Sequence, residues 1–107
     1  MISSDVIRGY NDTIILFMLR EKPSYGYEIS RRIKEISDEK YVIKETTLYS
    51  AFTRMEKNNY IESFSQVGEN GKNRTYYRIT DKGKDHFKEK CEEWALTKDV
   101  IDRFVVA

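Results

Sequence analysis

The apolar positions of the first half of the chain recur at helical spacing. Residues 14–19 are six apolar side chains in succession, inside a segment that runs from about residue 11 to residue 21. A helix with such a run is hydrophobic around most of its circumference, so we expect it to be buried on more than one side, partly by a second subunit. After Pro23 a second helix begins near Ser24, and its inward stripe consists of Ile29, Ile33 and Ile36.

Residues 45–61 predict a third helix with two contrasting faces. At 100° per residue, four apolar side chains share the inner side: Leu48, Ala51, Phe52 and Met55. The opposite side carries short hydroxyls and cations, with Tyr49 on the flank: Thr46, Ser50, Thr53 and Lys57, with Thr47 and Arg54 beside them. Asn58-Asn59 ends this helix, because Asn tolerates the left-handed backbone conformation.

Alternation of polar and apolar residues after residue 60 predicts a β-hairpin. Its strands are residues 61–67 and 74–80, and Asn70-Gly71 between them is a strong turn signal. Arg78 can pair with Glu62 across the hairpin. Residues 41–43, Tyr-Val-Ile, are β-prone and predict a further short strand.

The last segment predicts a long helix that is capped by Asp81 and runs to about Phe104. Its apolar positions, with one lysine, follow steps of four and three that are typical of a coiled-coil seam: Phe87, Cys91, Trp94, Lys98, Ile101 and Val105. We expect these residues to pair with another helix and Cys91 to be a small buried apolar residue. A sharper interpretation is a pocket at Trp94 in which planar apolar compounds stack.

This order of elements predicts a mainly α protein with a small β-hairpin wing, namely a winged helix-turn-helix followed by a long C-terminal helix. Residues 1–83 are expected to form the winged helix-turn-helix DNA-binding domain. Residues 84–107 are expected to form a C-terminal dimerisation helix that packs with the first helix as one compact unit.

Composition narrows the possible functions. Nineteen basic and eighteen acidic side chains give a net charge of +1, so the total charge makes no case for a nucleic-acid partner. Locally, residues 70–78 contain three cations and no acid. A single cysteine fits a reducing compartment, and neither a membrane-spanning run nor a signal peptide is visible, so we expect a cytoplasmic protein.

Candidate chemistry is sparse. His86 and Cys91 lack the further ligands that zinc requires, so no metal site is expected. The sequence contains no phosphate-binding glycine loop, nucleophile elbow or convincing catalytic pair of carboxylates. We therefore expect no enzymatic activity and no cofactor.

The outer face of the third predicted helix is the main functional candidate. Its hydroxyl residues are mediocre helix formers, and short side chains let a helix approach the floor of a DNA groove. We expect base and backbone contacts from Thr46, Thr47, Ser50 and Arg54, phosphate contacts from Tyr25 and Tyr49, and contacts to the flanking backbone from Lys72, Asn73 and Arg74. The alternatives are a solvated face, a protein-docking module without DNA binding, or a small-molecule-binding dimer.

Four blocks of sequence carry a resemblance to a known family: Arg8-Gly9-Tyr10 leading to Ile14-Ile15-Leu16, Ser24-Tyr25-Gly26-Tyr27-Glu28-Ile29, Thr47-Leu48-Tyr49 through Ile61, and Arg74 through Gly83. Together they resemble the short-form members of the PadR family of bacterial transcriptional regulators. Where that family usually has Gly and Pro around its Thr-Leu-Tyr motif, this chain has Thr46 and Ser50, so we expect these two positions to define its base preference.

The resemblance implies a homodimer built from the first and last helices, a pseudo-palindromic double-stranded DNA site and repression at a promoter. Members of the family often respond to an effector, and Trp94 resembles the position that stacks on planar compounds in some relatives. Candidate residues for the dimer interface or the effector pocket are Phe17, Phe87, Cys91, Trp94, Lys98 and Ile101.

Overall fold

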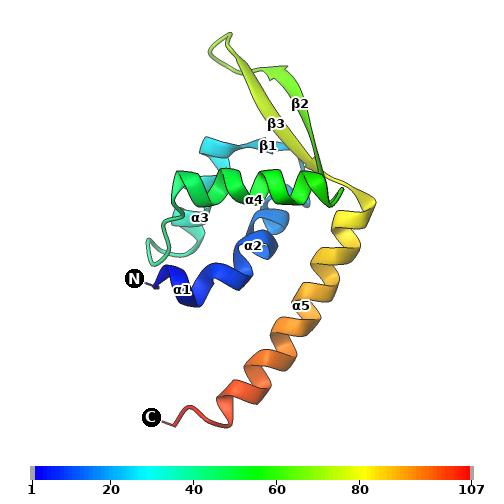
Figure 1. Ribbon diagram of the computed structural model, residues 1–107. Coiled ribbons are helices and arrows are strands. Elements are labelled where there is room, and N and C mark those ends of the chain that lie inside the picture. The colour runs from blue at the N-terminus through cyan, green and yellow to red at the C-terminus, as the bar shows by residue number, and fades with distance from the viewer. Residues whose placement is uncertain (1, 107) are drawn as a thin grey trace.

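The computed structural model describes residues 2–106 as a helical head from which a β-hairpin and a long helix project in different directions (Figure 1). The elements in chain order are α1 (Ser4–Ile7), the 3₁₀ turn η1 (Arg8–Tyr10), α2 (Asn11–Leu19), β1 (Ser24–Tyr25), α3 (Gly26–Ile36), α4 (Glu45–Lys57), β2 (Ile61–Val67), β3 (Asn73–Ile79) and α5 (Asp81–Asp102). The principal extents are 52 × 29 × 21 Å. The prediction of a mainly α protein with a small β-hairpin wing is confirmed.

Helix α2 occupies the centre of the head, where α3, α4, β3 and α5 all contact it. Four of the six residues of its apolar run are buried as predicted, namely Ile15, Leu16, Met18 and Leu19, whereas Ile14 is half-buried and Phe17 is exposed. The prediction for α3 is correct at Ile29 and Ile33 and wrong at Ile36, which is exposed. Ile36 is the last residue of α3, and the chain turns away there through Asp38 and Glu39 in the left-handed region.

Helix α4 presents the predicted inner face to the core: Leu48, Ala51, Phe52 and Met55 are all buried. The Phe52 ring stacks on Tyr77 of β3, with 4.0 Å between centroids, and so joins the helix to the sheet. The helix ends where the sequence predicts, because Asn59 adopts a φ of 64° and the Tyr60 amide donates to the Met55 carbonyl at 2.9 Å.

The sheet is antiparallel, with the strand order β1-β3-β2. The hairpin β2–β3 is confirmed, with Ile61 opposite Ile79 and Val67 opposite Asn73. The predicted strand at residues 41–43 is wrong, and the third strand is β1, which pairs with Tyr76 and Tyr77. Ser37 explains this, because its side chain bonds both the amide and the carbonyl of Tyr41 (3.0 and 3.1 Å), in the way a neighbouring strand would.

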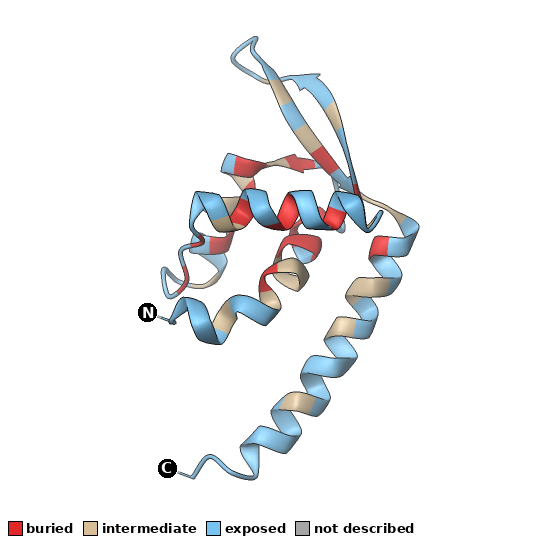
Figure 2. Ribbon diagram, in the orientation of Figure 1, coloured by how far each residue is buried: buried red, intermediate tan, exposed pale blue. Residues whose placement is uncertain are grey.

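Helix α5 begins against the head and then leaves it. The N-cap is Thr80, whose hydroxyl accepts from the Gly83 amide at 3.0 Å, and the predicted cap Asp81 is the first helical residue instead. Gly83 is the only buried residue of α5 (Figure 2). The thiol of Cys91 is exposed in the single chain, so its expected burial stays a prediction that requires a partner helix at the seam.

Candidate nucleic-acid interface

The outer face of α4 is an exposed stripe of short polar side chains. Thr46, Ser50, Thr53 and Lys57 are all exposed, and together they run the length of the helix. The Thr53 hydroxyl donates to the Tyr49 carbonyl one turn earlier, at 3.1 Å, so it is already paired within the helix. The stripe is therefore low in profile and able to approach another surface closely.

Tyr49 lies on the flank of α4 and reaches across to the start of α3. Its ring stands edge-on to Phe52, with 5.5 Å between centroids. Its hydroxyl lies over Gly26, the first residue of α3, where a Cβ would come within 2.5 Å of the Tyr49 oxygen. Glycine at position 26 thus lets this hydroxyl lie at a helix N-terminus, beside backbone amides that have no partner within the helix.

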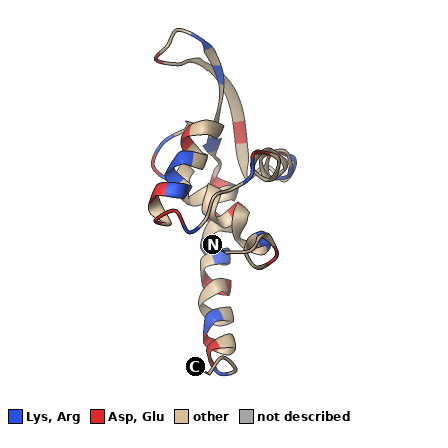
Figure 3. Ribbon diagram, turned by 90° about the vertical axis from the view of Figure 1, so that its left-hand side faces the viewer, with Lys and Arg blue, Asp and Glu red and all other residues tan. Residues whose placement is uncertain are grey.

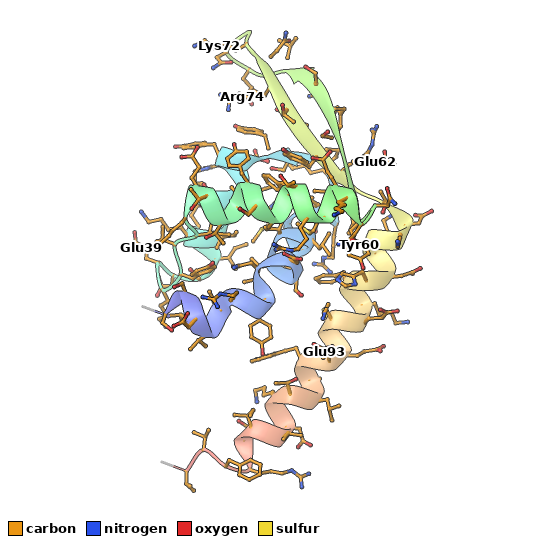
Figure 4. All side chains as sticks on the ribbon, in the orientation of Figure 1. Glu39, Tyr60, Glu62, Lys72, Arg74 and Glu93 are labelled. Atoms are coloured by element: carbon orange, nitrogen blue, oxygen red, sulfur yellow. The ribbon has the colours of Figure 1, made fainter. Side chains whose placement is uncertain are left out.

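The wing is closed by a five-residue loop, residues 68–72. The Gly68 amide donates to the Lys72 carbonyl (2.8 Å), the Gly71 amide donates to the Gly68 carbonyl (3.0 Å), and the Asn70 side chain accepts from the Lys72 amide (3.1 Å). Gly71 has a φ of 78°, which a glycine adopts without strain. Lys72 is consequently held at the exposed tip (Figure 4).

Arg74 extends from β3 back toward the head. Its guanidinium lies over the Tyr25 ring, 4.5 Å from the centroid, and the Tyr25 and Tyr76 rings are 5.2 Å apart. Gly68 leaves the necessary room, because a Cβ there would lie 2.9 Å from Arg74 Nε. Cation–π contact therefore keeps one positive charge in the space between the wing and α3.

Arg78 occupies a different position from Arg74. Its Nε donates to Glu62 of β2 at 3.2 Å, as the sequence predicted, and its guanidinium lies 4.6 Å from the Phe64 centroid. Since the charge is matched within the hairpin, Arg78 adds little to the positive potential of the wing. Charges of both signs are distributed over the helices and the hairpin (Figure 3).

Arg54 lies on the side of α4 that faces α2. Its Nε donates to Asp12 Oδ2 at 3.1 Å, and one of its terminal nitrogens donates to Asp12 Oδ1. These hydrogen bonds raise the pKa of Arg54 above its ordinary value. No local pattern indicates this partner, because Asp12 lies 42 positions earlier in the chain.

The residues expected at a dimer interface or effector pocket lie in two places. Phe17 and Phe87 flank the Arg20 guanidinium near the start of α5, at 4.4 and 5.4 Å. Farther along, a mainly apolar hollow of about 490 Å³ is lined by Trp94, Lys98 and Ile101 of α5 together with Thr97, Asp102, Ile2, Val6, Ile7 and Tyr10. Cys91 lines neither place.

Sequence reasoning missed six residues of this hollow: Ile2, Val6, Ile7, Tyr10, Thr97 and Asp102. The Tyr10 ring meets Trp94 edge-on, with 5.0 Å between centroids. The periodic pattern begins only at residue 11, so it did not mark the preceding segment as part of the lining of this hollow.

Across residues 2–106, no helix is both long and apolar enough to cross a bilayer.

Taken together, the exposed α4, the supporting α3 and the β2–β3 wing define a winged helix-turn-helix protein. The profile of the "Transcriptional regulator PadR-like family" matches residues 15–89. The chain belongs to this family, as its sequence resemblance predicted.

Solved structures and a sequence relative agree with this assignment. A transcriptional regulator from Clostridium thermocellum is 63% identical, with a TM-score of 0.91 over 99% of this chain and 100% of that chain. A PadR family transcription regulator from Clostridium difficile is 38% identical, with a TM-score of 0.78 over 90% of this chain and 98% of its own. An uncharacterized protein of Lysinibacillus sphaericus is 46% identical over 98% of this chain and 96% of its own length.

Proposed function

We propose that the protein is a homodimeric repressor that binds a pseudo-palindromic DNA site through α4 and the wing, and that a small planar or hydrophobic effector releases it. The observation that carries this proposal is the exposed hydroxyl stripe of α4 beside the wing cations. An α-helix with its side chains is about 10–12 Å across and fits the major groove, which is about 12 Å wide. Short side chains on the leading face let the helix reach the base edges.

The contacts divide by chemistry. Thr46, Thr47 and Ser50 lie where a helix in the groove meets bases, and their hydroxyls can donate to or accept from base edges. The hydroxyl of Tyr49, which reaches from α4 to the start of α3, and the ring of Tyr25 beneath Arg74 lie where phosphates would pass. Lys72, Asn73 and Arg74 of the wing contact the flanking backbone, which positions the protein without specifying the sequence.

Dimerisation is supported by the exposed apolar surface of α5. Trp94, Ile101 and Val105 lie on the predicted seam and are 47, 51 and 69% exposed. Leu96 and Val100 lie on the opposite side of α5, Phe104 follows just after the helix, and all three are exposed as well. A helix that is apolar on two sides loses stability in water, so more than one element of a second copy would cover it. A dimer also places two copies of α4 about 34 Å apart, on successive major grooves.

The effector part of the proposal is supported by the hollow at Trp94. Its lining is mainly apolar and includes the charged side chains of Lys98 and Asp102, and its volume of about 490 Å³ is in the range of small-molecule sites. An indole and a phenol ring standing edge-on offer π-faces on which a flat compound can stack. Quenching of Trp94 fluorescence by planar cations, together with their release of bound DNA, measures this function.

A salt titration tests DNA binding directly. Binding of wild-type protein to random duplex should weaken steeply as salt rises, because cationic contacts release counterions from the phosphates. Arg74→Ala should weaken binding to every sequence and lower the slope of log affinity against log salt by about 0.9.

Arg78→Ala serves as the matched control, since that arginine is already paired with Glu62 and should leave the slope close to that of wild type. An Arg74→Ala slope equal to that of wild type would reject the wing contact. Salt-independent binding, or none, would favour a protein-docking module instead.

A further inference from the structure

Arg54 differs from its neighbours on α4 in the direction it takes. At 100° per residue it lies roughly 80° around the helix from Thr46, whereas Ser50 lies roughly 40° away. Its side chain therefore leaves the exposed stripe and turns toward α2. A groove that admits the stripe would meet Arg54 only at its edge.

The guanidinium of Arg54 is already engaged. Two of its nitrogens donate to Asp12, one to each carboxylate oxygen, in the fork geometry that gives Arg–carboxylate pairs their directionality. The Arg54 side chain is 51% exposed and that of Asp12 is 26% exposed, so the pair is partly shielded from water. Reading a base would require Arg54 to leave this partner and to place an unpaired carboxylate near the phosphates.

Asp12 is held in place by its two predecessors. Residues 10–12 each contact a different part of the chain. Tyr10 packs edge-on against Trp94 of α5, and Asn11 accepts a hydrogen bond from the buried hydroxyl of Tyr41, in the segment that leads into α4. Asp12 then holds α4 itself through Arg54. The carboxylate thus belongs to a fixed point at the first turn of α2.

The contacts of α4 oppose two different movements of the helix. The buried apolar face sets how deeply the helix lies on the core, and Ser63 of β2 donates to Glu56 near the C-terminal end at 2.9 Å. Rotation of α4 about its own axis is opposed by contacts on its flank. Two flank contacts do so: the Tyr49 hydroxyl lies over Gly26 of α3, and the Asp12–Arg54 pair joins the opposite flank to α2.

We infer that Arg54 is a positioning residue: through Asp12 it sets the rotation of α4, and hence which hydroxyls face the base edges, while making no base contact itself. This inference rests on the proposed DNA-binding function and names the residues that orient its reading face. It assigns discrimination between sequences, rather than general affinity for DNA, to the ion pair.

Asp12→Asn provides a test in which the two roles of Arg54 predict opposite signs. The substitution raises the net charge by one, so a released, DNA-contacting Arg54 would bind every duplex more tightly. A positioning role instead predicts about threefold to fivefold weaker binding to the duplex that wild type selects from a random 30-base-pair library, with affinity for unselected random duplex not reduced.

Arg54→Gln and the double variant complete the cycle. Arg54→Gln should lose the same selectivity while keeping the salt slope of wild type, and the double variant should be no worse than either single one. Lys57→Gln and Glu69→Gln are the matched controls, because neither residue enters an ion pair within residues 2–106. The first should lower the salt slope, and the second should leave binding as tight as wild type or tighter.

Each variant is first shown to be folded by its thermal unfolding curve, so that a change in binding can be assigned to the side chain that was replaced. Tighter binding by Asp12→Asn, a reduced salt slope in Arg54→Gln, or additive effects in the double variant would overturn the inference and leave the proposed function standing. Failure of wild type to bind any duplex at low salt would overturn both.

Discussion

Replacing Gly83 by alanine tests whether the junction between the head and α5 is as tightly closed as its geometry indicates. Gly83 lies in the first turn of α5, directly against the chain segment that leaves α4. A Cβ at this position would lie 2.1 Å from the Tyr60 carbonyl oxygen and 2.8 Å from a side-chain carbon of Ile79. The Tyr60 oxygen is backbone and cannot rotate away as a side chain would.

The magnitude follows from that distance. A carbon–oxygen contact needs about 3.3 Å, so the junction must open by about 1.2 Å. Opening it stretches the hydrogen bond from the Thr80 amide to the same carbonyl, which is 3.0 Å long in the structure. Overpacking costs about 1–3 kcal/mol and a weakened hydrogen bond about 1 kcal/mol, against about 1 kcal/mol gained from the higher helix propensity of alanine. We expect a net loss of about 2 kcal/mol in the free energy of unfolding.

Circular dichroism at the helical minimum, followed during urea and thermal unfolding at one fixed protein concentration, measures this loss. For a chain of this size it corresponds to a fall of about 10 °C in the midpoint of thermal unfolding. Gly9→Ala is the control, because a Cβ at position 9 meets no atom within 4 Å, and its stability should stay within about 0.5 kcal/mol of wild type. A Gly83→Ala protein as stable as wild type would refute the close contact.

Two further predictions concern Tyr41 and α5. Burial raises the pKa of Tyr41, against a smaller lowering by the bond to Asn11, so its contribution to stability is complete below about pH 10 and is lost as the pH rises through the folded-state pKa. The free energy of unfolding in urea should therefore fall less between about pH 9 and pH 11 for Tyr41→Phe than for wild type. At neutral pH the substitution should cost about 1 kcal/mol, because it leaves Asn11 unpaired. Parallel pH profiles of the two proteins would contradict this. The Ile101→Glu variant, altered on the exposed α5 surface, should sediment as a monomer. Lys88→Glu adds the same side chain at a polar exposed position and should sediment as wild type does. Identical sedimentation profiles of the two variants would argue against dimerisation through this segment.

Sequence pattern was sufficient where each element carries its own signal. The inner face of α4 follows the helical period, and Asn70-Gly71 marks the turn of the wing, so both elements were predicted to within a residue or two. Asn59 likewise ends α4 by its own backbone conformation. The hydroxyl stripe could be predicted because helical periodicity fixes the direction of every side chain once the helix is known.

The remainder depends on contacts between distant residues. Strand β1 contains only two residues and exists because it pairs with Tyr76 and Tyr77. The β-prone segment at Tyr41 is diverted by the side chain of Ser37. The Asp12–Arg54 pair joins two helices whose spacing no local pattern reveals. The exposure of Cys91 is likewise a result of the direction that α5 takes after Gly83.

That direction has a consequence for the geometry of an assembled regulator. Helix α5 contains 22 residues and is therefore about 33 Å long, so a small difference in its angle at Gly83 becomes a large displacement at its far end. A tilt of about 5° at Gly83 displaces the far end by about 3 Å. In the proposed dimer joined through α5, the same tilt would change the distance between the two heads. The contact between Gly83 and the Tyr60 carbonyl would then help to set the spacing of the two DNA half-sites that such a dimer binds.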